Sequence, residues 1–161
     1  MFNKNNWKEP INKEDLRYVL FNGILGFIVA GAFGGAINYL LGRYVFLDLA
    51  FAVLLLIVPW RVKKSFYENH ILYAVLGIVF LFLGFFVASF TENLITGILI
   101  QNPFFFLTNP SFYISFMIEP VMNLIWGIIS LDILSILIGI LDIFCYSFAF
   151  YYTYTSIRRK R

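Results

Sequence analysis

The chain has 161 residues, of which 61% are hydrophobic, 20% are aromatic and only 13% are charged. A water-soluble domain has about 45–50% apolar and about 25% charged residues, and a globule of this length has too small an interior to bury so much apolar surface. An intrinsically disordered chain is excluded as well, because such chains are poor in apolar residues. We therefore expect an all-α, polytopic integral membrane protein that forms a single domain over residues 1–161.

The N-terminal residues 1–17 are polar and are expected to form a cytoplasmic arm. Asn12 is placed to cap the start of a helix. The run 18–41 that follows contains no charged residue and is long enough to cross the hydrocarbon core of a bilayer. The sequence therefore predicts a first transmembrane helix at about 18–41.

Three further spans are predicted from apolar runs, at about 44–60, 71–90 and 133–155. Tyr44 and Trp60 are placed as interfacial aromatic residues at the two ends of the second run, which Pro59 and a basic cluster close. Glu92 is expected to mark the end of the third run. The last span leads into a basic tail at 156–161.

The segment 93–131 is harder to assign because it is apolar but broken. Its three prolines are Pro103, Pro110 and Pro120. Proline interrupts a helix, and the pieces between the prolines are too short to span. We expect a Pro-broken re-entrant or outer-leaflet segment beside four transmembrane helices. The alternative is six transmembrane helices, in which 94–107 and 112–130 both cross.

The basic residues border the apolar runs, as topology signals do. They are Lys4, Lys8, Lys13 and Arg17; then Arg43; then Arg61, Lys63 and Lys64; and finally Arg158, Arg159, Lys160 and Arg161. The positive-inside rule places both termini and the 61–70 loop in the cytoplasm, which requires an even number of spans. The expected location is a cell membrane, and a residue usage rich in Ile and Asn suggests a bacterial source. A nucleic-acid partner is not expected, because such binders carry a basic face on a folded domain.

Small residues form a stripe along the first span. This helix-contact stripe consists of Gly26, Ala30, Gly31, Gly34, Gly35 and Asn38. In lipid, small residues allow two helix backbones to approach closely, and an Asn can hydrogen-bond across the interface. The stripe therefore predicts a packing surface, either for another helix of the same chain or for a second copy.

The last span carries the least expected residues for a membrane helix. Asp132, Ser135, Asp142 and Tyr146 fall on one side of it at 100° per residue. Asp142 lies ten residues past Asp132, roughly 15 Å deeper and near the bilayer midplane. Such a carboxylate must face protein or water. Either it serves a proton, cation or headgroup site, or it joins helices through hydrogen bonds.

A further acidic residue, Glu119, precedes Pro120 in an otherwise apolar stretch. Broken helices at membrane depth often line cavities, so Glu119 is a candidate member of the same intramembrane polar site. The alternative is a position at the level of the outer headgroups.

Enzyme signatures are absent from the sequence: there is no nucleophile elbow, zinc-protease motif or P-loop. The single cysteine, Cys145, lies in an apolar run and is expected to be an inert thiol. The single histidine, His70, has no cysteine partner that would make a metal site. We expect no enzymatic activity, no cofactor and no metal.

The plan of four short spans with both ends inside and a basic tail resembles the GtrA-like group of small bacterial lipid-linked-sugar translocases. The start of the first span, Arg17 to Phe21, and the aromatic end before Arg158 carry this resemblance. The paired motifs of that group are not evident here, so it assigns no site residues. A six-span plan would instead resemble small vitamin-uptake subunits, with Ala32 and Ala36 as a docking motif.

Two functions follow from these patterns. The first is an accessory, regulatory or interaction subunit that works through helix–helix contacts, with the bilayer and either another membrane protein or a second copy as partners. The alternative is a small carrier or flippase for a cation, a proton-coupled solute or a lipid-linked headgroup, which would use the intramembrane acidic face.

Overall fold

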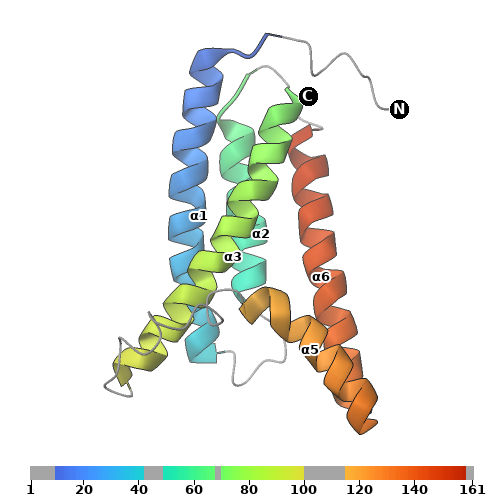
Figure 1. Ribbon diagram of the computed structural model, residues 1–161. Helices are drawn as coiled ribbons and strands as arrows, with labels where there is room; N and C mark the ends of the chain where they lie inside the picture. The colour runs from blue at the N-terminus through green and yellow to red at the C-terminus, as the bar shows by residue number, and fades with distance from the viewer. Residues whose placement is uncertain (1–9, 42–48, 68–69, 100–114, 159–161) are drawn as a thin grey trace.

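The computed structural model describes residues 10–41, 49–67, 70–99 and 115–158, and all regular structure in this part of the chain is α-helical. The helices are α1 (Lys13–Leu41), α2 (Leu49–Lys64), α3 (Ile71–Leu99), α5 (Ser115–Ser130) and α6 (Ile133–Arg158) (Figure 1). Helices α1, α3 and α6 are each long and apolar enough to cross a membrane. The all-α expectation is thereby confirmed, and the composition of these three helices suits a membrane.

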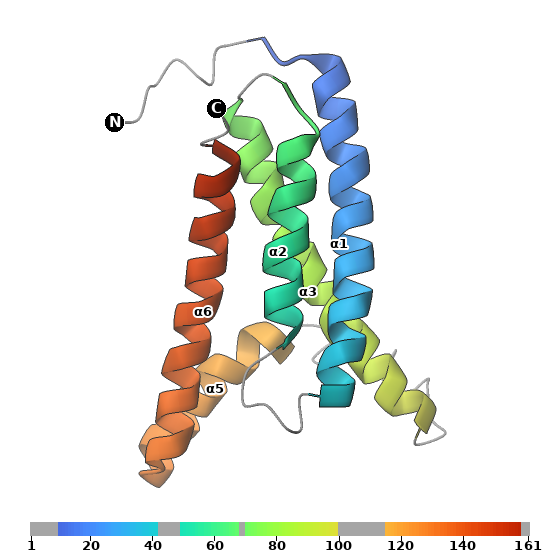
Figure 2. The same ribbon diagram turned by 180° about the vertical axis from the view of Figure 1, so that it is seen from behind.

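Helices α1, α2 and α3 pack against one another, and α6 lies against α2 and α3 (Figures 1 and 2). Helix α5 packs mainly on α6, with which it forms an antiparallel pair, the α5–α6 hairpin. The start of α1, the end of α2, the start of α3 and the end of α6 lie at one end of the bundle (Figure 1). We call this the basic end, after its described residues Lys13, Arg17, Arg61, Lys63, Lys64 and Arg158.

Contacts between distant segments hold the basic end together. Asp15 is buried, and its carboxylate accepts a hydrogen bond from the backbone amide of Tyr67, with 3.0 Å between Oδ2 and N. The hydroxyl of Tyr73 donates to the carbonyl of Asn12 at 3.4 Å. The side chain of Asn12 in turn accepts a bond from the amide of Glu14 at 3.0 Å. This confirms the predicted helix cap.

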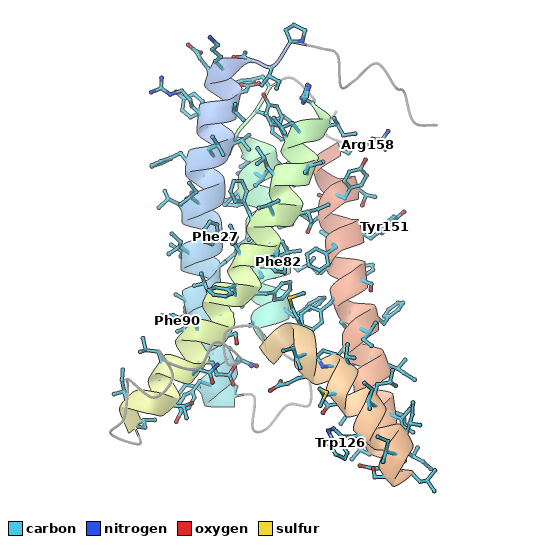
Figure 3. All side chains as sticks on the ribbon, viewed as in Figure 1. Phe27, Phe82, Phe90, Trp126, Tyr151 and Arg158 are labelled. Atoms are coloured by element: carbon cyan, nitrogen blue, oxygen red, sulfur yellow. The ribbon has the colours of Figure 1, made fainter. Side chains whose placement is uncertain are left out.

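The core lies where α1, α2, α3 and α6 meet. Leu54, Leu81 and Phe85 are fully buried there. The ring of Phe85 lies 4.9 Å from the ring of Tyr146 at an interplanar angle of 80°, which joins α3 to α6 by an edge-to-face contact. The side chains of Phe27 and Phe80 stack between α1 and α3, with ring centres 6.0 Å apart; the Phe27 side chain can be followed in Figure 3.

Helix α3 was predicted to end near Glu92, but it continues to Leu99. The threonine side chains in this stretch find their hydrogen-bond partners within the helix. The Thr91 hydroxyl donates to the carbonyl of Val87 at 2.8 Å, and the Thr96 hydroxyl donates to that of Glu92 at 3.0 Å. Because these bonds run four residues back, they follow the helix instead of breaking it.

Pro120 does not break the chain into separate apolar pieces, as was expected from the sequence. Helix α5 runs from Ser115 to Ser130 through Pro120, which is buried. Because proline has no backbone N–H, α5 gives up the one bond that residue 120 would otherwise donate to the carbonyl of residue 116. Pro103 and Pro110 lie outside the described residues. Helix α2 likewise continues through Pro59 and past Trp60 to Lys64.

Candidate functional site

The α5–α6 hairpin contains most of the predicted intramembrane site, and it turns at Leu131. This residue has a φ of 56°, the left-handed conformation that ends many helices. The backbone amide of the next residue, Asp132, donates to the carbonyl of Gly127 at 2.9 Å. This is the bond of a Schellman motif, so α5 stops at Ser130 and the chain reverses within two residues.

Asp132 starts α6 by capping it. Its Oδ1 accepts the amide of Leu134 at 3.1 Å, and its Oδ2 accepts the hydroxyl of Ser135 at 2.6 Å. The Ser135 hydrogen bond, aided by the backbone amides of the first turn, lowers the pKa of the Asp132 carboxyl below its ordinary value. Asp132 and Ser135 thus lie at the hairpin tip, where their hydrogen bonds cap the start of α6.

Two glycines bring the helices of the hairpin together. A Cβ atom at Gly127 would lie 2.7 Å from the backbone nitrogen of Ile136. A Cβ atom at Gly139 would lie 2.8 Å from the nitrogen of Leu124 and 2.8 Å from the carbonyl oxygen of Pro120. Neither position has room for a side chain, so the α5 and α6 backbones touch at both.

These contacts set the register of the hairpin. Gly139 of α6 faces the α5 turn that starts at Pro120. One helical turn further from the tip, Asp142 on α6 and Glu119 on α5 are therefore at about the same height. Both lie roughly 17–18 Å from Leu131 at the tip, because each residue of a helix rises by about 1.5 Å. The two carboxylates were predicted to belong to one site, but their common level was not predicted.

The two carboxylates differ in exposure. Asp142 is half-buried, whereas Glu119 is exposed on the surface of α5. Tyr146, one turn beyond Asp142, turns inward: its ring makes edge contacts with Phe51 and Phe85 of the core. Of the predicted polar set, the structure therefore places Asp132 and Ser135 at the tip, Asp142 and Glu119 at mid-height, and Tyr146 in the core.

Most of the hairpin surface is apolar and uncovered. Only 11% of the most apolar stretch of α6 is buried, against 50% for α3. Helix α6 meets the core through its C-terminal half, where Thr153 and Ile157 lie against Gly77 of α3. Trp126, which is 59% exposed, lies toward the far end of the hairpin, opposite the basic end marked by Arg158 (Figure 3).

The helix-contact stripe of α1 faces the other helices of the same chain. A Cβ atom at Gly31 would lie 2.6 Å from the carbonyl oxygen of Gly84 on α3, and one at Gly34 would lie 3.1 Å from Cα of Ala50 on α2. Ala30 is also fully buried. Two further members, Gly35 and Gly26, lie against α3 and α2, respectively.

Asn38, the last member of the stripe, donates from its side-chain amide to Glu92 of α3, with 3.0 Å between Nδ2 and Oε2. Glu92 was predicted only to mark the end of a span, and its hydrogen bond to Asn38 was not predicted. The available signal was the coincidence of an Asn at the end of a small-residue stripe with a lone Glu late in another apolar run.

Among the described residues, no group of three or more His, Cys, Asp or Glu side chains is placed to hold a metal ion. His70 accepts the amide of Leu72 at its Nδ1, with 3.0 Å between the atoms, and thereby caps α3. No family model matches the chain, and no curated protein or solved structure matches it either. The resemblance to the GtrA-like group therefore stays an expectation.

Proposed function

We propose that the chain is a multi-pass membrane protein that acts through helix–helix contacts, as an accessory, regulatory or interaction subunit. Its contact surface is the exposed face of the α5–α6 hairpin. The observation that carries the proposal is the exposed Glu119 on that face, about 18 Å from the hairpin tip by helix rise.

A carboxylate at such a depth costs about 2.5–3.5 kcal/mol when it faces lipid. Among the residues that the structure describes, Glu119 has no hydrogen-bond partner. Three and seven residues further along the same face are Met122 and Trp126, which are exposed as well. Exposed aromatic and Met side chains around one polar group are suited to receive a neighbouring helix, which would supply a polar partner for Glu119.

The proposed orientation in the membrane follows from charge. The described Lys and Arg residues all lie at the basic end, whereas Glu92, Glu119, Asp132 and Asp142 lie away from it. The positive-inside rule puts the basic end on the cytoplasmic side of a cell membrane. Reporter fusions after Lys64 and after Arg161 should both report a cytoplasmic location. An external signal at Arg161 would contradict an even number of spans.

Site-specific photo-crosslinking in native membranes tests the proposed contact surface. A photoreactive residue at Met122 or Trp126 should give a protein adduct of one defined mass, and the adduct should disappear with Glu119→Leu. The same residue at Phe33 of α1, which is 59% exposed, should give lipid adducts only. Lipid adducts at all three positions would contradict a protein partner at the hairpin.

A second candidate, a small proton-coupled or cation carrier, is favoured by the common height of Glu119 and Asp142 on facing helices. Paired carboxylates at one depth can hold a cation or exchange a proton. Proteoliposomes should then show a proton or cation flux that Asp142→Asn abolishes while the variant stays folded. An unchanged flux in Asp142→Asn would remove Asp142 from the carrier mechanism.

A further inference from the structure

Arg61 occupies an unusual position near the end of α2. Its side chain is half-buried against α1, where a Cβ atom at Gly26 would lie 3.5 Å from Cβ and 3.6 Å from Cγ of Arg61. The guanidinium reaches one turn toward the basic end and donates from Nη1 to Oδ1 of Asn22 at 3.4 Å. The apolar stem of Arg61 thus lies on α1 beside Gly26, while the charge extends toward the membrane surface.

The charge of Arg61 is not neutralised by the described part of the chain. Asn22 is a neutral amide, and it is the only side chain there that hydrogen-bonds to the guanidinium. The buried carboxylate of Asp15, two turns before Asn22 on α1, accepts the amide of Tyr67. A half-buried guanidinium that keeps most of its donors unused pays for desolvation without a counter-charge.

The surroundings of Arg61 are those of the lipid headgroup level. Trp60 is 53% exposed, and the ammonium of Lys64 lies 4.1 Å from the centre of its ring. On α1, Tyr18 is exposed one turn beyond Asn22, whose amide donates to the Tyr18 carbonyl at 3.0 Å. Amphipathic rings of this kind collect at the membrane interface, and Arg and Lys side chains next to a membrane helix attract anionic lipids.

We infer that Arg61, held by Asn22 where α2 packs on α1 and assisted by Lys64, binds the phosphate of an anionic phospholipid headgroup. The planar guanidinium has donors spaced for two phosphate oxygens, and a charge-assisted pair of this kind is stronger than a neutral hydrogen bond. The acyl chains of the same lipid would cover the exposed apolar side chains of α1 below Tyr18. This site is independent of the hairpin surface, at the opposite end of the bundle.

The experiment uses the full chain in nanodiscs of phosphatidylcholine with rising fractions of phosphatidylglycerol. The melting temperature of the protein should rise with the fraction of phosphatidylglycerol, and native mass spectrometry should find this lipid bound to the protein. Arg61→Gln should weaken the apparent affinity by about tenfold or more, the equivalent of one charge-assisted hydrogen bond. Arg61→Lys, which keeps the charge without the fork, should give an intermediate loss.

Matched controls separate this site from general surface charge. Arg158→Gln removes a basic-end guanidinium that donates to Tyr154 instead, and it should change the affinity less than about twofold because it leaves Arg61 intact. The inference would be overturned if both Gln variants lost the same affinity for phosphatidylglycerol, or if the wild-type protein had the same melting temperature with and without that lipid. Asn22→Ala keeps every charge and should still weaken retention, so the inference stays testable if Arg61→Gln does not fold. If inorganic phosphate alone raised the melting temperature as much as phosphatidylglycerol does, the ligand would be a soluble phosphate, and the lipid assignment would be overturned.

Discussion

The side-chain amide of Asn38 on α1 donates a hydrogen bond to the carboxylate of Glu92 on α3, and the two atoms are 3.0 Å apart. The bond lies one turn beyond the close approach of Gly35 to Ala88. It therefore fixes the rotation of the two helices at the end of an interface made otherwise of small apolar contacts.

Asn38→Ala should lower the free energy of unfolding by about 1.5–3 kcal/mol, the usual contribution of a hydrogen bond to a charged group. Unfolding in detergent, followed by circular dichroism, measures the loss. The control is Thr96→Val, because the Thr96 hydroxyl bonds only within its own helix, and it should cost less than about 0.5 kcal/mol. Equal effects of the two changes would mean that Asn38 does not link the helices.

The glycines of α1 should differ in their tolerance of alanine. Gly31→Ala should destabilise the protein by about 1–3 kcal/mol, because the new Cβ would press on the backbone of Gly84 and on Val87. Gly26→Ala should be neutral or stabilise by up to about 1 kcal/mol, since its Cβ would meet Arg61 at an ordinary contact distance and alanine favours the helix. Thermal melts of the two variants decide this, and a reversed order would contradict the packing described.

The hairpin turn should be stabilised by glycine. Leu131 adopts a φ of 56° although its side chain is 84% exposed and buries little surface. Leu131→Gly should raise stability by about 1 kcal/mol, because a left-handed conformation is costly for residues with a Cβ. Leu131→Val should lower stability, since β-branched residues tolerate this region least. A destabilised Leu131→Gly variant would show that the turn depends on the leucine side chain.

The start of α6 should weaken in acid. The Asp132 pKa is lowered from 3.8 in the folded protein, first by the Ser135 hydrogen bond. A depressed carboxyl pKa contributes stability that is present above the unfolded pKa and is lost as pH falls through the folded pKa. Melting temperatures should therefore fall below about pH 4, and the fall should be smaller in Asp132→Asn and in Ser135→Ala. An unchanged acid response in both variants would assign it to other groups.

The apolar runs of α1, α3 and α6 could be located from the sequence because their length and lack of charge are local properties. The end of α3 and the passage of α5 through Pro120 could not, since both depend on how single residues satisfy the backbone. Thr91 and Thr96 bond within the helix, and α5 continues despite the one backbone bond that Pro120 cannot donate.

The candidate site was predictable in its members but not in its arrangement. Asp142 and Glu119 are unusual residues in apolar stretches, which the sequence shows directly. Their common height depends on the register of α5 against α6, and that register is set by Gly127 and Gly139, whose partners cannot be inferred from one sequence. The contact of Arg61 with Asn22 could not be predicted for the same reason.

The α5–α6 hairpin also has a consequence for biogenesis. Its closing contacts, from Asp132 to Ser135 and from Gly139 to Pro120, join residues that are near in the chain, and such contacts form quickly. The contact of Gly31 with Gly84 closes a much longer loop and must wait until α3 has been synthesised. We expect the nascent protein to assemble as two units, an N-terminal three-helix unit and a late-inserting helical pair, which join when Tyr146 reaches Phe85.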